Sequence, residues 1–188
     1  MLATLIRHKF TVEEYHRMAE VGILNGDRRV ELIAGEIIDM SPIGAAHLWC
    51  VNRLTGLLVI GLAGKAVIQV QNPVVLEPHD EPQPDLSVLK LETATRTDRS
   101  PQAADTLLAI EVADTSYEKD RNVKIPVYAR AGIPESWIVV IPDDYIEVFR
   151  RPGKSGYRSI RRVGRGERIS PLLFPDVSFS VDEILGGE

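Results

Sequence analysis

The stretch Leu107-Leu108-Ala109-Ile110-Glu111-Val112 decides the fold of this chain. Its apolar residues follow one another almost without interruption, which predicts a strand buried in the middle of a sheet. Glu111 breaks the run at a position where an apolar side chain is expected. Because burial of a carboxylate is costly unless a cation or a metal ion accompanies it, Glu111 needs a partner.

Other strands and helices surround this stretch in an order typical of a mixed sheet flanked by helices. Runs rich in Val, Ile and Leu predict further strands at residues 66–71, 74–77, 85–90, 136–141, 146–150, 157–163 and 177–179. A hairpin is expected at residues 29–33 and 36–40, after an Asn25-Gly26-Asp27 turn. Helices are expected at residues 12–21, 45–62 and 122–131. We therefore predict an α+β or α/β fold.

The composition narrows the classes of protein to consider. The chain has 188 residues, of which 44% are hydrophobic, and this predicts a single domain over residues 1–188. The net charge of −5 argues against a general polyanion binder. The single cysteine, Cys50, excludes an intramolecular disulfide and favours the reducing cytoplasm. Asn52 and Arg53 interrupt the apolar stretch 45–62, so we expect a core helix there and no membrane span.

Two carboxylates and a lysine fall at the edges of the most buried elements. Asp85 begins a predicted strand, Glu111 lies near the carboxyl end of the central strand, and Lys124 follows on the next helix. Metal-assisted hydrolysis of a phosphodiester requires oxygen ligands for Mg²⁺ and a cation that orients or stabilises the reacting charge. An equally simple interpretation is an ion pair of Glu111 with Lys124, with Asp85 capping a turn.

Several motifs together resemble one bacterial family. They are Arg29-Val-Glu31-Leu-Ile-Ala-Gly35-Glu36-Ile-Ile-Asp-Met40-Ser41-Pro42 followed by His47, Pro84-Asp85-Leu-Ser-Val, Leu108-Ala-Ile-Glu111-Val, Asp120 with Lys124 and Tyr128, and Ala131-Gly132-Ile-Pro-Glu-Ser-Trp137-Ile-Val-Val. This pattern covers nearly the whole chain and is similar to the Uma-type putative restriction endonuclease family. The resemblance implies a restriction-endonuclease-like fold of the PD-(D/E)xK nuclease superfamily. It also implies an endonuclease that hydrolyses DNA with Mg²⁺ or Mn²⁺.

Four residues match the family's site. The resemblance implies that Asp85 and Glu111 bind the metal and that Glu31 is the additional N-terminal acid found beside the metal in many such nucleases. The lysine departs from the simple E-x-K spacing of the superfamily, because Ala113 stands two residues after Glu111, and the family resemblance offers Lys124 in its place. Lys124 is then the expected catalytic lysine, displaced to the following helix, where its long stem lets it reach the same space.

The helix that carries Lys124 contains Pro126. A proline fits there only if the helix begins near Val123, since a residue in the first turn loses no helical hydrogen bond. Asp120 lies four residues before Lys124, and we expect it either to orient the lysine or to form a plain surface pair with it. Lys119 is a weaker candidate for the catalytic lysine.

The remaining candidates each have a simpler alternative. His47 opens the helix at residues 45–62, where it either approaches a substrate phosphate or serves as a polar residue at a helix end. Glu31 is either the supporting acid or an exposed residue of an alternating strand. Trp137 and Tyr128 are interpreted as core aromatics.

Residues 150–168 hold eight Lys or Arg residues against the single Glu167, a net charge of +7 that leaves −12 for the rest of the chain. Such a basic β-ribbon either tracks phosphates, with Arg158, Arg161 and Arg162 as the expected DNA contacts, or is a solvated meander. Its exposed strand edges and the family resemblance predict a homodimer. Because the chain is acidic and position 113 lacks a lysine, a non-catalytic nucleic-acid-binding or protein-interaction module with the same fold stays an alternative.

Overall fold

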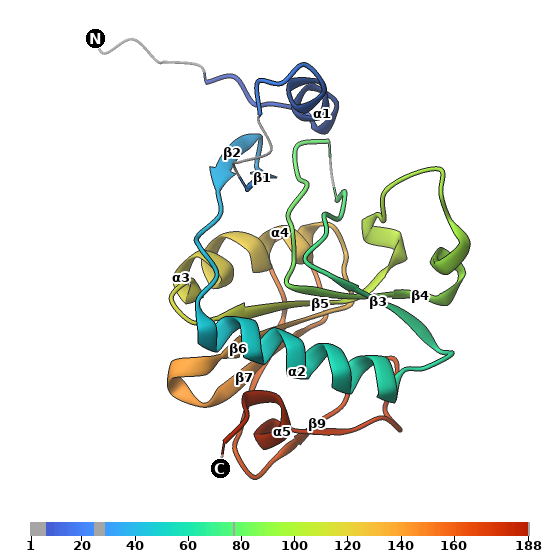
Figure 1. The fold of residues 1–188 in the computed structure, drawn as a ribbon, viewed down its shortest axis with the longest axis vertical. Helices are drawn as coiled ribbons and strands as arrows, with labels where there is room; N and C mark the ends of the chain where they lie inside the picture. Colours follow the sequence, from blue (N-terminus) through green and yellow to red (C-terminus); the bar gives the residue numbers. More distant parts are fainter. Residues whose placement is uncertain (1–6, 25–28, 77, 188) are drawn as a thin grey trace.

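A six-stranded mixed sheet forms the centre of the computed structural model, which describes residues 7–24, 29–76 and 78–187 (Figure 1). Its strands lie in the order β3-β4-β5-β6-β7-β8, and neighbours are antiparallel except β5 and β6. Glu111 lies on the third strand in this order, β5, which is buried as predicted. The strands are β3 (Ala66–Val70), β4 (Leu86–Lys90), β5 (Thr106–Ala113), β6 (Glu135–Val140), β7 (Tyr145–Arg150) and β8 (Ser159–Gly164).

Helices cover both faces of the sheet (Figure 1). They are α2 (Ala45–Gly61), α3 (Tyr117–Lys119), the π-helix η3 (Asp120–Lys124), α4 (Ile125–Arg130) and α5 (Val181–Leu185). α2 and α5 pack on one face, where Leu54 and Leu58 join Ile110 of β5 in the larger hydrophobic cluster. α4 covers the other face, toward which Ala109 of β5 points because side chains alternate along a strand. The predicted mixed sheet flanked by helices is confirmed.

A smaller N-terminal part lies at one end of the molecule (Figure 1). It consists of α1 (Val12–Glu20) and the hairpin of β1 (Val30–Ile33) and β2 (Glu36–Asp39). Thr11 and Glu14 form the predicted capping box of α1. Two backbone hydrogen bonds between Leu32 and Glu81, at 3.3 and 2.8 Å, tie the hairpin to the segment before β4. They hold Glu31, the neighbour of Leu32, close to the start of β4.

Short elements complete the described chain. They are three 3₁₀-helices, η1 (Leu91–Thr95), η2 (Ala103–Asp105) and η4 (Ile141–Asp143), and the strands β9 (Arg168–Ile169) and β10 (Phe179–Ser180). The expectation that a last strand at residues 177–179 completes the main sheet is wrong, because β10 pairs with β9 in a separate two-stranded sheet. Gly164 ends β8.

The strand predicted at residues 74–77 is also wrong for its described part, 74–76. Val75 forms only an isolated bridge with Gln102. Prolines at positions 73 and 78 flank this stretch, and a proline cannot donate to a strand ladder. Glu77 and the predicted Asn25-Gly26-Asp27 turn lie outside the described residues.

The helix predicted at residues 122–131 begins earlier, at Tyr117, and continues through a π-helix. The Ile125 N–H donates to the carbonyl of Asp120, five residues back, where a regular α-helix bonds four residues back. Pro126 is the second residue of α4, directly after this π-turn, and it has no N–H to donate. The expectation that the proline requires a helix start near Val123 is therefore wrong, because the wider π-turn carries the helix past it.

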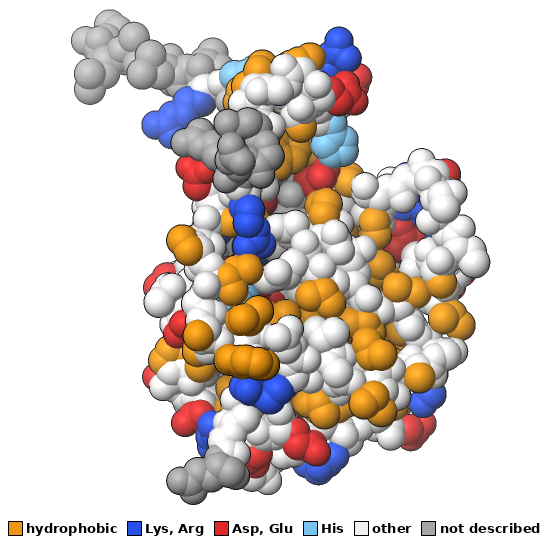
Figure 2. All heavy atoms as spheres, viewed as in Figure 1, with side chains coloured by type: hydrophobic (Ala, Val, Ile, Leu, Met, Phe, Trp, Pro, Cys, Tyr) orange, Lys and Arg blue, Asp and Glu red, His pale blue; other side chains and the backbone are white. Residues whose placement is uncertain are grey.

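The apolar helix at residues 45–62 is α2, and it is a core helix. No helix among the described residues is both long and apolar enough to cross a membrane. Figure 2 shows hydrophobic side chains gathered on the face of the molecule that α2 covers. The large apolar side chains of α2 that are exposed are Leu48, Trp49, Val59 and Ile60.

The packing of α2 on the sheet has a direct test. Leu58→Ala is expected to lower the free energy of unfolding by about 2–5 kcal/mol, because the Leu58 side chain is fully buried against the sheet. Ile60→Ala removes a side chain of the same helix that is 81% exposed, and we expect a change below about 0.5 kcal/mol. Guanidinium unfolding followed by circular dichroism measures both variants. Equal losses of unfolding free energy in Leu58→Ala and Ile60→Ala would show that α2 does not pack as described.

Candidate active site

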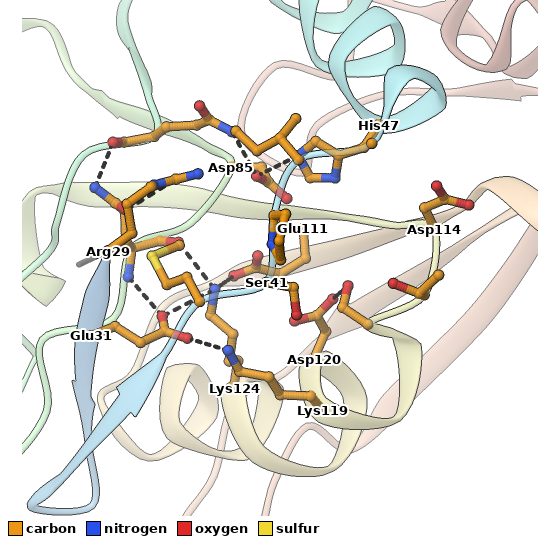
Figure 3. Close-up of a pocket in the computed structure, with 18 residues that line it drawn as sticks. Arg29, Glu31, Ser41, His47, Asp85, Glu111, Asp114, Lys119, Asp120 and Lys124 are labelled. Atoms are coloured by element: carbon orange, nitrogen blue, oxygen red, sulfur yellow. Dashed lines mark hydrogen bonds and ion pairs between the residues drawn. The ribbon is translucent and has the colours of Figure 1, made fainter. Parts of the chain in front are cut away.

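A cavity of about 240 Å³ lies where β4 begins and β5 ends, which is the same end of both antiparallel strands (Figure 3). It is lined by the hairpin strand β1, the loop before α2, the segment that leads into β4, and the chain from the end of β5 to η3. Seven of its residues are candidates that the sequence predicted, namely Glu31, His47, Asp85, Glu111, Lys119, Asp120 and Lys124.

Asp85 and Glu111 are neighbours across the β4-β5 pair. Pairing ends at Leu86 with Ile110, and one further step along the two antiparallel strands places Asp85 beside Glu111. Oδ2 of Asp85 accepts a hydrogen bond from the Val112 N–H at 2.9 Å. The Asp85 carboxylate is therefore fixed at the mouth of β4 by the backbone of β5.

Glu111 is enclosed, with 2% of its surface exposed. Its Oε1 accepts a hydrogen bond from the Tyr128 hydroxyl and lies 2.7 Å from Nζ of Lys124. Burial raises the pKa of Glu111 well above its ordinary value, and the opposing effect of Lys124 is too small to cancel this. Tyr128 is the core aromatic that the sequence predicted, and its hydroxyl also positions the Glu111 carboxylate.

Lys124 reaches the same place from the π-helix. Its Nζ lies 2.7 Å from Oε1 of Glu111 and 3.4 Å from Oε2 of Glu31, and it donates to the carbonyl of Gln83 at 3.0 Å. Burial alone would lower the pKa of Lys124, yet the surrounding carboxylates raise it above the ordinary value. The ammonium group of Lys124 is therefore charged at neutral pH.

Glu31 lies beside Lys124, on the hairpin side of the cavity. Its Oε1 is 2.7 Å from Nζ of Lys119, and its Oε2 accepts a hydrogen bond from the Gln83 N–H at 3.2 Å. Burial would raise the pKa of Glu31, but Lys124 and Lys119 lower it. Because Glu31 is only 1% exposed, the alternative in which it is an exposed strand residue is wrong.

Asp120 is buried on the opposite side of the cavity from the hairpin (Figure 3). It accepts a hydrogen bond from the Ser116 hydroxyl at 2.5 Å. Burial raises the pKa of Asp120. The alternative of a plain surface pair with Lys124 is wrong, because both side chains are enclosed.

His47 lies in the first turn of α2 and contacts both Asp85 and β5. Its Nδ1 is 2.9 Å from the carbonyl oxygen of Val112, which can only accept, so Nδ1 carries a proton and donates. Its Nε2 is 3.0 Å from Oδ1 of Asp85. This contact raises the pKa of His47, and it lowers the pKa of Asp85 against the effect of burial. His47 is thus more than a polar residue at a helix end, because it contacts both Asp85 and the backbone of β5.

Gln83 and Asp114 are among the cavity residues that the sequence did not single out. Gln83 acts through its backbone, since its N–H donates to Glu31 and its carbonyl accepts from Lys124. Any residue type offers these groups, so a motif cannot reveal them. Asp114 directly follows β5, and its place after the carboxyl end of a buried strand was the available signal.

The arginines expected to contact DNA lie away from this cavity. Arg158, Arg161 and Arg162 belong to the edge strand β8 or lead into it, and they are not among the described residues that line the cavity. β6 and β7 separate β8 from β5, a distance of about 14 Å at the usual strand spacing. Arg161 pairs with Glu167 at 3.1 Å and Arg162 with Glu147 at 3.0 Å. Glu167 is already included in the count of +7 for residues 150–168, so it is the pairing of Arg162 with Glu147, outside that window, that lowers the free positive charge.

Comparisons with known proteins agree with this architecture. A family model described as "Uma2: Putative restriction endonuclease" matches residues 12–182. The chain belongs to the Uma2 family. A solved structure titled as that of "a putative nuclease belonging to DUF820" from Anabaena variabilis ATCC 29413 has the same fold, with a TM-score of 0.72 and 15% sequence identity. The match covers 94% of this chain and 97% of that chain. No curated protein matches the sequence.

The cavity of this Uma2 protein is rich in acidic groups, but they do not all face one point. Across the described ranges, no three His, Cys, Asp or Glu side chains form a ready metal site. Asp85 and His47 approach each other, whereas the Glu111 carboxylate is turned toward Lys124 and Tyr128. Asp85 and His47 thus lie close together as two possible metal ligands, and Lys124 and Tyr128 hold Glu111 beside them.

The central position of Lys124 makes a prediction about stability. Lys124→Met is expected to lower the free energy of unfolding by about 3–5 kcal/mol near neutral pH, because Glu31 and Glu111 lose an enclosed cation. The folded-state pKa of Glu31 is below its unfolded value of about 4.5, so its contribution is present above that pH and is lost as the pH falls through the folded value. The difference in unfolding free energy between the wild type and Lys124→Met is therefore expected to become smaller in acid. Urea unfolding of both proteins at several pH values measures this difference.

Lys119→Met is the matched control for this prediction. Lys119 contacts the same Glu31, but its side chain is 30% exposed, so its loss is expected to cost less than about 1 kcal/mol. Equal losses for the two lysine variants would contradict the enclosed role of Lys124.

Proposed function

We propose that this Uma2 protein is a divalent-metal-dependent endonuclease that hydrolyses DNA phosphodiester bonds at this cavity. The observation that carries the proposal is the enclosed arrangement of Glu31, Asp85 and Glu111 around the Lys124 ammonium group. Acidic oxygens and a fixed cation are the groups that metal-assisted phosphodiester hydrolysis uses. The description of the family points to the same class of enzyme.

Asp85 and Glu111 would hold the metal ion, Mg²⁺ or Mn²⁺. Both ions prefer oxygen ligands and keep several waters, so two carboxylates suffice. The surroundings fit a cation, because Asp114 and Asp120 also line the cavity. In addition, Lys124 offsets only part of the cost of burying the ionised Glu111 carboxylate, so a further positive charge would stabilise it. When bound, such an ion polarises the phosphate and activates water for attack.

Lys124 would act by its positive charge. The carboxylates around it keep the ammonium group protonated, so it is unsuited to act as a general base at neutral pH. Glu111, Glu31 and the carbonyl of Gln83 hold it in one place. A fixed charge of this kind stabilises the negative charge that develops on phosphate oxygens in the transition state.

Glu31 and Tyr128 would position the groups that touch the substrate. Glu31 holds both Lys124 and Lys119, and the Tyr128 hydroxyl holds the Glu111 carboxylate. Side chains that are fixed before substrate arrives need no reorganisation during the reaction. Lys119 is the more exposed of the two lysines and is available to a phosphate at the cavity mouth.

Cleavage of supercoiled plasmid DNA tests this proposal. Wild-type protein is expected to cut the plasmid in Mg²⁺ or Mn²⁺ and to stop in EDTA. Asp85→Asn and Glu111→Gln are each expected to reduce the rate by at least about 100-fold, because each removes a charged ligand of the metal.

Asp176→Asn is the control, since Asp176 is exposed and is not among the residues described around the cavity. It is expected to keep the wild-type rate, with circular dichroism showing that all the variants fold. Metal-dependent cleavage that persists in both cavity variants would contradict the proposal. DNA binding by the wild type without any cleavage would favour the non-catalytic binding module instead.

The contribution of residues 150–168 to DNA binding has a separate test. If Arg161 contacts a phosphate, Arg161→Ala is expected to flatten the log-log dependence of duplex affinity on salt by about one unit. Fluorescence anisotropy in an Asp85→Asn background measures binding without cleavage. Arg17→Ala, which removes an exposed arginine of α1, is the control. An unaltered slope for Arg161→Ala, Arg158→Ala and Arg162→Ala would mean that β8 is a solvated face.

A further inference from the structure

We propose that His47 is a direct ligand of the metal ion, through Nε2, and that the site therefore binds Mn²⁺ in preference to Mg²⁺. The inference rests on the proposed metal site at Asp85 and Glu111. It adds a nitrogen donor to that site and states which of these two ions the site prefers.

The place of His47 follows from the way the β4-β5 ladder ends. Continued pairing would bring Val112 opposite Pro84, which has no N–H to donate. Side chains satisfy the Val112 backbone instead: its N–H donates to Oδ2 of Asp85 and its carbonyl accepts from Nδ1 of His47, both at 2.9 Å. One residue of β5 thus fixes the carboxylate and the imidazole next to each other.

The hydrogen bond from Nδ1 determines what Nε2 can do. A neutral imidazole carries one proton, so when Nδ1 donates to Val112 the lone pair lies on Nε2. In histidines that bind metals, the N–H of the other ring nitrogen usually donates a hydrogen bond to a backbone carbonyl or a carboxylate, as Nδ1–H of His47 does to Val112. Nε2 is buried and directs no hydrogen bond at a described atom, although Oδ1 of Asp85 lies within ion-pair distance.

The distance between the two donor atoms fits a shared ion. Nε2 of His47 and Oδ1 of Asp85 are 3.0 Å apart. Adjacent ligands of an octahedral ion, each at about 2.1 Å, are separated by about 3.0 Å. An ion pair between protonated His47 and Asp85 has a similar length, so the experiment has to detect the metal-nitrogen bond itself.

A nitrogen ligand changes which ion the site prefers. Mg²⁺ favours oxygen donors and dehydrates reluctantly, whereas Mn²⁺ accepts imidazole alongside carboxylates. A cavity with only Asp85 and Glu111 would distinguish the two ions weakly. With His47 included, the same cavity is expected to bind Mn²⁺ at least about 10-fold more tightly than Mg²⁺.

Pulsed electron paramagnetic resonance of Mn²⁺ added to the full chain, free of any histidine tag, provides the direct readout. Echo-envelope modulation from ¹⁴N reports a nitrogen bonded to Mn²⁺, and we expect it in the wild type and not in His47→Asn. An asparagine amide can still donate to the Val112 carbonyl, while Nε2 is gone. Calorimetry is expected to show Mn²⁺ affinity reduced by at least about 10-fold in His47→Asn, with a smaller change for Mg²⁺.

His79→Asn is the matched control. Nδ1 of His79 also contacts a backbone carbonyl, that of Phe10 at 2.8 Å, but His79 is not among the described residues of the cavity. This variant is expected to keep both the ¹⁴N modulation and the Mn²⁺ affinity of the wild type.

The possible outcomes separate this inference from the proposed function. One outcome is that the wild type binds Mn²⁺ without ¹⁴N modulation and that Asp85→Asn no longer binds the ion. This result would overturn the role of His47 and leave the nuclease proposal standing. Modulation that persists in His47→Asn would also overturn that role. Failure of the wild type to bind Mn²⁺ would overturn both. If His47→Asn does not fold, the wild-type spectrum still tests the inference, because the absence of ¹⁴N modulation there would overturn it.

Discussion

The ion pair between Lys124 and Glu111 is the interaction on which the rest of the site depends. Glu111 lies in the central strand β5, and both Glu111 and Lys124 are buried. A buried pair of this kind adds little net stability compared with apolar side chains, but each member becomes costly when the other is removed. Glu31, Tyr128 and the Gln83 backbone satisfy the remaining hydrogen-bonding groups. Such an arrangement is expected where chemistry, and not packing, selects the residues.

The backbone around the pair explains how the charged groups come together. The π-helix passes Pro126 and supplies Lys124 from the helical layer, in place of a lysine on β5, where Ala113 stands. The early end of the β4-β5 ladder leaves the Val112 backbone to the side chains of Asp85 and His47. Two local irregularities, one in a helix and one in a sheet, therefore build opposite sides of one cavity (Figure 3).

Much of this was available from the sequence. The apolar run with one glutamate located β5, the capping box located α1, and the motif residues of the hairpin, of β4 and of η3 do line one cavity. The π-helix could not be predicted, because it is defined by the hydrogen bond from the Ile125 N–H to the Asp120 carbonyl, which no residue type reveals. The pairing of Arg162 with Glu147 also depends on a tertiary contact, so the charge count overstated the free charge of β8. The homodimer and the DNA contacts stay predictions.

Anomalous diffraction from crystals soaked in Mn²⁺ would locate the metal ion itself. We expect one strong anomalous peak in the cavity, within bonding distance of Asp85 and Glu111, with the Lys124 ammonium group beside it. Soaked crystals that show no peak there, or a peak bound only by surface carboxylates while Glu111 keeps its contacts with Lys124 and Tyr128, would contradict the account.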